Sequence, residues 1–465
     1  MIWKAILFTA LLLVNLHLFG QKTVDITLGK DEVIMDFVDL QEQGFVIKTG
    51  KEKYYSKNVD WHLRYYTPTL EEVWSLPIEP SQGNKGRGQD VVVAPSGNYV
   101  YHVENQGFIS DILVGGIQLT QVNRQGQVRS HEVGKDILGK IAGIEEIRLC
   151  DESHFYIVSL KQGNNNTPTQ LFLNRFLHQD FSFSQLTVEL PIIARKNSVA
   201  PWEYAGHGKQ HIWFVSKTIP NEKDAIQCQL VAVDWQGKIA RKLTVNQAMP
   251  SVYLRGSMNH KHSIGAVARR TATTSYTDQN HMSGMPHTTF KLGTSGWTSV
   301  YMDDNSDIVY VYGLYGKKQR KGSAAYADGF YLMAFNEKGE LLWQHLSNER
   351  DPILEDKYFQ KRLTSDQRAT MAYLTTEGVR FQIRVPRALY TYDFSQNGQR
   401  IDMYQNSYYN PENRTFFLSL PADSSARTYY QTNASKKKTY FGTNTSLSNV
   451  LIEHDGKRAL RLLQW

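Results

Sequence analysis

Four histidines lie close together in one stretch of this sequence, residues 246–297, and three methionines lie beside them. The histidines are His260, His262, His281 and His287, and the methionines are Met258, Met282 and Met285. Imidazole and thioether groups suit soft or borderline metals such as copper and zinc. His260 and His262 would face the same side of a strand, because side chains alternate there with a period of two. We therefore predict these four histidines as candidate ligands of a divalent metal. The alternative is a histidine-rich loop that binds no metal, since no helical histidine pair or cysteine spacing fixes a geometry.

Other motifs that could do chemistry are weaker. Asp303, Asn305 and Asp307 have the first spacings of a calcium-binding loop. However, Ile308 and Leu314 stand where that loop needs glycine and glutamate, and a hairpin turn also explains the polar residues. No nucleophile or phosphate-binding motif occurs in its proper context, and sequence alone cannot pair carboxylates across a pocket. The sequence therefore leaves any catalytic residue and any cofactor unassigned, apart from the candidate divalent metal.

The strands and turns that would hold such residues in place recur about every 55 residues along the chain. In each repeat an apolar strand runs into a polar turn, and a second apolar strand runs out of it. Glycine ends most of these turns, at Gly126, Gly237, Gly339, Gly398 and Gly456. Another hairpin precedes each of them, and turn residues between apolar or alternating runs are typical of hairpins. Each repeat is therefore predicted to be a four-stranded unit.

Seven such units are predicted from the repeat. They lie near residues 31–78, 88–133, 144–190, 202–245, 298–346, 369–404 and 411–465. Four-stranded sheets bury both faces when they pack radially around an axis, and seven is within the usual number of blades. We therefore predict an all-β chain that forms a single seven-bladed β-propeller over residues 21–465. Residues 23–28 are placed to close the ring by joining the last unit. The turns at 67–70 and 178–180 lack the glycine, so their units have a weaker pattern.

Two segments interrupt the repeat. Residues 246–297, which hold the four histidines, could form an eighth blade or a long loop. We prefer the loop, because irregular connections of this length are usually functional or disordered. Residues 348–367 are predicted to contain a short helix, with Asp351 as its cap and Pro352 in its first turn.

Two tryptophans follow turns in a recurring way, Trp74 in residues 69–74 and Trp343 in residues 335–343. The pattern resembles that of quinoprotein-type and related bacterial propellers, in which the tryptophan docks one blade on the next. The resemblance implies the architecture alone. The quinone-site residues of that family cannot be carried over to any position of this sequence.

The chain begins like an exported protein. Lys4 precedes an apolar run over residues 6–19, and Gly20 is a small residue at a cleavage point, so residues 1–20 are predicted to be a secretory signal peptide. An uncleaved anchor is the alternative, and no later segment reaches membrane-spanning length. We therefore expect the protein in a periplasm, at a cell surface or outside the cell.

The two cysteines of the chain, Cys150 and Cys228, are predicted to be buried small residues, with a disulfide between them as the alternative.

The net charge of +7 is small for 465 residues. The basic runs at 317–321 and 436–438 have no nucleic-acid motif beside them, so nucleic acid is not predicted as a partner.

The preferred function is a non-catalytic binding or scaffold module for a protein or carbohydrate ligand, with 246–297 as its specificity element. Two alternatives stay open. One is a hydrolase or lyase that acts on polysaccharide through carboxylates near the axis, and the other is a metal-binding protein that uses the four histidines.

Overall fold

The fold was taken from a computed structural model of the chain. The structure describes residues 22–29, 32–51, 61–78, 89–94, 96–105, 108–109, 112–113, 117–138, 144–164, 166–192, 202–207, 210–218, 225–248, 299–303, 308–315, 329–348, 350–360, 369–374, 377–385, 388–407, 424–433, 439–444, 448–454 and 459–465. The predicted signal peptide, the four candidate histidines and the polar turn at 304–307 lie outside these residues.

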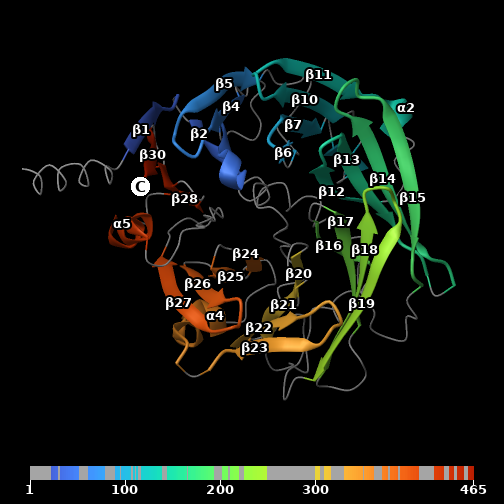
Figure 1. Ribbon diagram of the computed structural model, residues 1–465, viewed down its shortest axis with the longest axis vertical. Helices are drawn as coiled ribbons and strands as arrows, with labels where there is room; N and C mark the ends of the chain where they lie inside the picture. Colours follow the sequence, from blue (N-terminus) through green and yellow to red (C-terminus); the bar gives the residue numbers. More distant parts are fainter. Residues whose placement is uncertain are drawn as a thin grey trace, which may run out of the picture.

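The described residues form seven four-stranded antiparallel sheets arranged in a ring (Figure 1). Blade one consists of β2 (Glu32–Asp39), β3 (Phe45–Lys51), β4 (Trp61–Tyr66) and β5 (Glu72–Ile78). Blade two consists of β6 (Gln89–Val93), β7 (Tyr99–Asn105), β10 (Ile117–Asn123) and β11 (Val128–Val133). Blade three consists of β12 (Ile144–Cys150), β13 (His154–Lys161), β14 (Thr169–Leu177) and β15 (Phe183–Leu190). Blade four consists of β16 (Glu203–His207), β17 (His211–Thr218), β18 (Ala225–Asp234) and β19 (Ile239–Ala248). Blade five consists of β20 (Ser299–Asp303), β21 (Ile308–Tyr315), β22 (Gly329–Phe335) and β23 (Leu341–Leu346). Blade six consists of β24 (Ala369–Leu374), β25 (Gly378–Val385), β26 (Ala388–Ser395) and β27 (Arg400–Ser407). Blade seven consists of β28 (Thr439–Asn444), β29 (Asn449–His454), β30 (Ala459–Gln464) and β1 (Lys22–Thr27). The predicted seven-bladed propeller is confirmed.

The first strand of the chain closes the ring. Strand β1 pairs with β30, from Lys22 opposite Gln464 to Thr27 opposite Ala459, and so forms the outer strand of blade seven. The expected closing role of residues 23–28 is therefore confirmed. One detail of the prediction is corrected: the connection that contains Gly456 joins the second and third strands of its blade, β29 and β30, because β1 supplies the fourth strand.

The hydrophobic core is divided among the contacts between neighbouring blades. Val46 of blade one, for example, packs in one cluster with Val100 and Val122 of blade two. The innermost strands β16 and β20 lie against each other, so blades four and five are direct neighbours. An eighth blade built from residues 246–297 would have to separate them, which excludes that alternative.

The two cysteines are buried in different parts of this core. Cys150 packs between blades two and three, and Cys228 packs between blades four and five. They form no disulfide with each other. Their predicted burial is confirmed.

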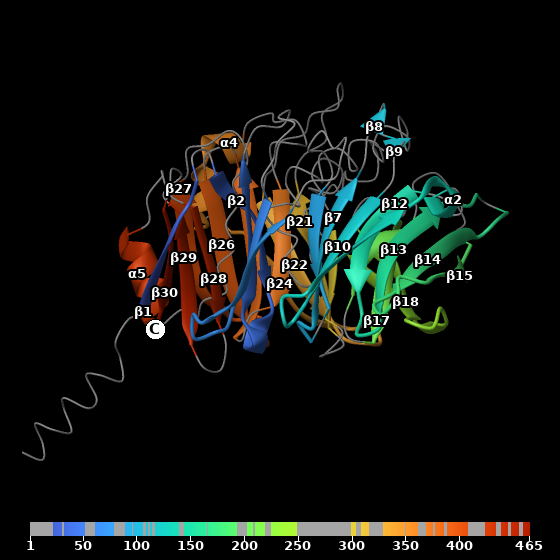
Figure 2. The same ribbon diagram turned by 90° about the horizontal axis from the view of Figure 1, so that it is seen from above.

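Connections leave the sheets at two edges of the ring, because neighbouring strands run in opposite directions. At one edge, the turn edge, three to five residues join the first strand to the second and, in blades one to six, the third to the fourth. At the other edge, the loop edge, most connections are longer, and the longest is 249–298. The loop-edge connections contain β8 (Phe108–Ile109), β9 (Ile112–Leu113), α2 (Lys135–Leu138), the 3₁₀ helix η3 (Pro352–Glu355), α4 (Lys357–Gln360) and α5 (Ser425–Asn433). Figure 2 shows α4 and the β8–β9 hairpin on the same side of the ring.

Asp351 precedes η3, but its carboxylate does not cap that helix. It accepts hydrogen bonds from the Asn348 N–H at 2.8 Å and from Arg400 at 2.8 Å.

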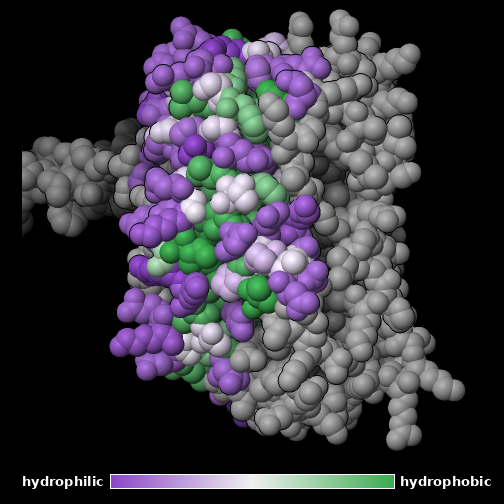
Figure 3. Space-filling model, turned by 90° about the vertical axis from the view of Figure 1, so that its right-hand side faces the viewer, coloured by the Kyte–Doolittle hydropathy of each residue, from purple (hydrophilic) through white to green (hydrophobic). Residues whose placement is uncertain are grey.

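The side of the ring drawn in Figure 3 mixes polar and apolar side chains. Among the described helices, none has the length and apolar character needed to cross a membrane.

Candidate functional site at the joint between blades two and three

A recurring contact holds each blade to the next, and we call each of these contacts a joint. In blades one to six, the turn between the third and fourth strands contains one residue with a positive φ angle. These residues are Leu70 (58°), Gly126 (77°), Phe181 (58°), Gly237 (82°), Gly339 (80°) and Gly398 (82°). The outer strand of the preceding blade packs on this position. A Cβ added to Gly126 would meet the Cβ of Trp74 at 3.4 Å, and one added to Gly398 would come within 2.5 Å of the Trp343 ring. Both tryptophans therefore dock one blade on the next, as the resemblance implied.

Two of the six joints have a large residue where the others have glycine, and these are the two units with the weaker sequence pattern. A non-glycine residue in the left-handed region costs about 1 kcal/mol. The side chains compensate by packing in the joint. Leu70 packs in a cluster with Leu460 and Leu462 of blade seven, and Phe181 is 6% exposed between blades two and three.

Phe181 is held between groups of blade two. The His131 ring stacks on it, with centroids 4.8 Å apart and planes 6° apart, and the Arg129 guanidinium lies 5.2 Å from its centroid. Arg129 also donates a hydrogen bond to the Gln179 carbonyl. The side chain at the left-handed position thus makes contacts that glycine could not make.

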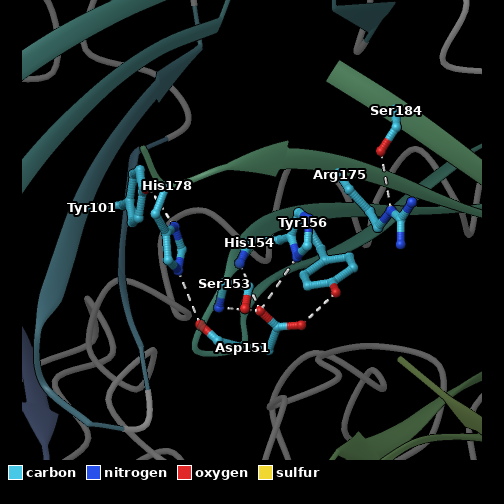
Figure 4. Close-up of polar contacts among 8 residues, drawn as sticks. All are labelled: Tyr101, Asp151, Ser153, His154, Tyr156, Arg175, His178 and Ser184. Carbon is cyan, nitrogen blue, oxygen red and sulfur yellow. Dashed lines mark hydrogen bonds and ion pairs between the residues drawn. The ribbon is translucent and has the colours of Figure 1, made fainter. Parts of the chain in front are cut away.

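A buried hydrogen-bond chain lies beside Phe181 in the same joint (Figure 4). The His178 ring contacts the Tyr101 hydroxyl through Nδ1 at 2.7 Å and the Asp151 carbonyl through Nε2 at 3.0 Å. A carbonyl only accepts, so Nε2 carries the proton, and Nδ1 accepts from Tyr101. Gln121 Nε2 donates to the Tyr101 oxygen at 2.5 Å and to the His178 carbonyl at 2.9 Å. These contacts fix both the tautomer and the orientation of the imidazole.

The Asp151 carboxylate extends the chain within blade three, to the turn between β12 and β13. Its Oδ1 accepts from the backbone N–H groups of Ser153 and His154, both at 2.6 Å, and its Oδ2 accepts from the Tyr156 hydroxyl at 2.5 Å. The Tyr156 ring lies 4.9 Å from that of Trp235 in blade four. The chain therefore runs from Tyr101 of blade two through two turns of blade three to Tyr156, whose ring packs against blade four.

Burial dominates the electrostatics of this joint. It lowers the pKa of His178, against the opposing effect of the hydrogen bond to Asp151. It also lowers the pKa of His131 and raises the pKa of Tyr101 and Tyr156. At neutral pH the chain is therefore composed of neutral histidine and tyrosine groups around one carboxylate.

This chemistry supports a structural role for the joint. Both ring nitrogens of His178 are engaged within the protein, and the ring is almost fully buried. Among the described residues, no group of three or more histidine, cysteine, aspartate or glutamate side chains could hold a metal ion. Sequence reasoning singled out His178 only as part of a turn without glycine. It missed Tyr101 and Gln121, whose contacts join positions 57 to 77 residues apart.

A second polar cluster lies in blade one, toward the loop edge. On the face toward blade two, Lys48 lies near His102 of β7, Glu104 lies on the same strand as His102, and all three residues are buried. His102 Nδ1 is 3.8 Å from Glu104 Oε1. Burial, with Lys48 adding to it, holds the pKa of His102 well below its usual value.

The opposite face of blade one also carries charged groups. Arg64 Nη1 donates to the Thr49 hydroxyl at 2.5 Å, and Thr49 donates to the Glu32 carboxylate. Burial raises the pKa of Glu32, but hydrogen bonds from Thr49 and the Gly29 N–H, together with Arg64, outweigh it and lower the pKa. Charged groups therefore line both faces of blade one near the loop edge.

No protein-family model matches the sequence, and no curated protein matches it. Several solved structures are similar in fold at low identity. The β-propeller domain of the Trilobed protease from Pyrococcus furiosus is 9% identical with a TM-score of 0.40, and the match covers 94% of each chain. The acylaminoacyl peptidase of Pyrococcus horikoshii is 9% identical with a TM-score of 0.38, over 93% of this chain and 51% of the peptidase. The GH93 α-L-arabinofuranosidase of Fusarium graminearum is 6% identical with a TM-score of 0.35, over 83% of this chain and 95% of that enzyme. These similarities assign no residue role and no activity to this chain.

Proposed function

We propose that the protein is an exported, non-catalytic propeller that binds a protein or carbohydrate ligand at the loop edge. The observation that carries the proposal is the difference between the two edges. At the turn edge, turns of three to five residues hold the residues with positive φ, and those residues are covered by the neighbouring blade. The loop edge carries the long connections, and binding residues are concentrated on long loops held by a rigid scaffold.

The composition of blade one supports the same edge. Buried charged groups cost free energy unless they are paired and hydrogen-bonded, so they are uncommon in a propeller core. Lys48 and Arg64 of blade one, and Glu104 of blade two, lie near the loop edge, whereas the core nearer the turn edge of blade one contains residues such as Phe45 and Val46. Residues 246–297 join the blades at this edge, and we assign them the role of specificity element.

Site-specific photo-crosslinking tests which edge binds the ligand. A photoreactive residue is placed at three exposed loop-edge positions, Asp136, Asn164 and Lys357, and at three matched turn-edge positions, Gln125, Gln236 and Glu337. The proposal expects the same partner to be crosslinked from the loop edge alone, and expects that adduct to disappear when 251–298 is replaced by a short Gly/Ser linker. Crosslinks from the turn edge alone would overturn it. Hydrolysis of a polysaccharide panel by the purified protein would also overturn it, in favour of the hydrolase alternative.

A further inference from the structure

The joint between blades two and three contains two histidines that take part in the contact itself. His178 lies in the turn between β14 and β15, and His131 lies on β11 of the preceding blade. We propose that this joint is acid-sensitive: it is closed at neutral pH and loosens locally when His178 and His131 take up protons. The proposal concerns the scaffold and is independent of the ligand.

Protonation of His178 would disrupt the hydrogen bonds that now hold its ring. Protonation would place a hydrogen on Nδ1, which now accepts from the Tyr101 hydroxyl at 2.7 Å. The Tyr101 oxygen would then have to accept from both His178 and Gln121, and its own hydrogen would lose its acceptor. Both residues are buried, at 2% and 0% exposure, so the displaced hydroxyl has no water nearby. A buried donor without a partner destabilises the closed joint.

Protonation of His131 would also be unfavourable in its present surroundings. Its Nε2 is buried and has no hydrogen-bond partner among the described residues. Its ring stacks on Phe181, which also receives the Arg129 guanidinium at 5.2 Å. A proton on His131 would therefore put a second positive charge on the same aromatic ring, next to a cation that is already bound there. Arg129 is exposed, so solvent weakens this repulsion, and the larger cost is charging a ring whose Nε2 is shielded from water and has no partner among the described residues.

Several charged or titratable groups face these two rings. They are Arg129 on β11, Tyr99 and Tyr101 on β7, Asp151, Glu152 and His154 at the turn between β12 and β13, and Asp180 in the turn between β14 and β15. The Asp151 carboxylate would attract a charged His178, but its oxygens already accept from Ser153, His154 and Tyr156. The net effect is that burial lowers the pKa of both histidines. The folded joint therefore binds fewer protons than the unfolded chain, and its stability falls as pH drops below about 6.5.

The joint between blades four and five provides an internal control. Its turn contact consists of Gly339 against Leu243 and Thr244 and so contains no histidine; the nearest described histidine to its buried cluster is His211, whose ring lies 6.2 Å from that of Trp213. Acid should therefore affect this joint less than the joint between blades two and three. The two joints differ in chemistry but share one ring, so both can be measured in the same sample.

Hydrogen–deuterium exchange of the intact protein at pH 7.5 and pH 5.0 tests the proposal, after correction for the intrinsic dependence of exchange on pH. Backbone protection in β7 and β14 should fall at pH 5.0 by at least about tenfold relative to β18 and β22. In the double variant His131→Gln, His178→Gln this relative loss should disappear, whatever the overall stability of the variant. Equal loss of protection in both joints, no loss in either, or an unchanged relative loss in the double variant would each overturn the proposal. If the double variant does not fold, the comparison of the two wild-type joints decides alone.

Discussion

The Trp343 indole covers Gly398 of the next blade so closely that a methyl group on the glycine would overlap the ring. The Trp343 Nε1–H donates to the Gln396 carbonyl at 2.9 Å, and this hydrogen bond fixes the ring over the turn. A Cβ on Gly398 would lie 2.5 Å from two ring atoms. Two residues 55 positions apart thus form one contact that connects blades five and six.

Replacing Gly398 with alanine should destabilise the protein by about 2–4 kcal/mol. The substitution adds backbone strain at a φ of 82° and forces the Trp343 ring to move. Gly126→Ala is the matched control, because its φ is similar at 77° but its added Cβ would meet Trp74 only at 3.4 Å. It should cost about 1 kcal/mol, from the backbone alone. Urea denaturation measures both, and equal losses would contradict the role given to Trp343.

Replacing Phe181 with glycine should also destabilise the protein, although glycine is the residue found at the same position of four other blades. Relief of strain at a φ of 58° returns about 1 kcal/mol. Loss of a buried phenyl ring costs about 3–5 kcal/mol, so a net loss of about 2–4 kcal/mol is expected. Phe181→Leu is the control, since it keeps the strain and part of the packing. A glycine variant as stable as the wild type would show that the stack with His131 contributes nothing.

Removing the charge of Asp393 should cost far more than removing that of Asp25. Asp393 accepts two hydrogen bonds from Arg380, at 2.6 and 2.8 Å, and both side chains are buried. The Asp393→Asn variant leaves a buried guanidinium without its counter-charge, and the expected loss is about 3–5 kcal/mol.

Asp25 pairs with Arg461 at a similar 2.8 Å, but the two side chains are 59% and 46% exposed. Asp25→Asn should therefore cost less than about 1 kcal/mol, and less still in high salt. Thermal unfolding of the two variants, with and without added salt, checks the difference. Similar costs would mean that burial does not decide the strength of these pairs.

Alanine at His260, His262, His281 and His287 should abolish binding of copper or zinc, if these residues form the predicted site. The prediction rests on the sequence, since the four residues lie outside the described ranges. Isothermal titration of the intact protein with each metal is the measurement. His62→Ala is the control, because its Nε2 already contacts the Ser75 hydroxyl at 2.7 Å in blade one. Wild-type protein that binds neither metal would refute the site.

The architecture could be predicted because its signals are local. Alternating apolar residues and glycine in tight turns mark hairpins wherever they occur, and seven blades followed from counting them. The joints at Leu70 and Phe181 were harder to predict. A large residue in the left-handed region is rare, so its sequence gives no indication of that backbone conformation.

The polar networks could not be predicted for a different reason. Their partners come from distant parts of the chain, as in the hydrogen bond from Ser448 to the Pro68 carbonyl, which spans 380 residues. Nothing in the local sequence around Tyr101 indicates that His178 will reach its hydroxyl. Such pairs depend on the relative position of neighbouring blades, which is known only after the ring is built.

The pairing of β1 with β30 also determines the order in which this protein can mature. Residues 22–27 leave the ribosome long before their partner strand at 459–464 is made. Throughout synthesis the outer edge of the last blade does not exist, and β1 has no native neighbour to pair with. An unpaired strand of this kind can join another copy of the chain, so crowding during synthesis favours exchanged strands between molecules. Closure of the ring therefore waits for β30, and until then the edge of β1 is open to other copies of the chain.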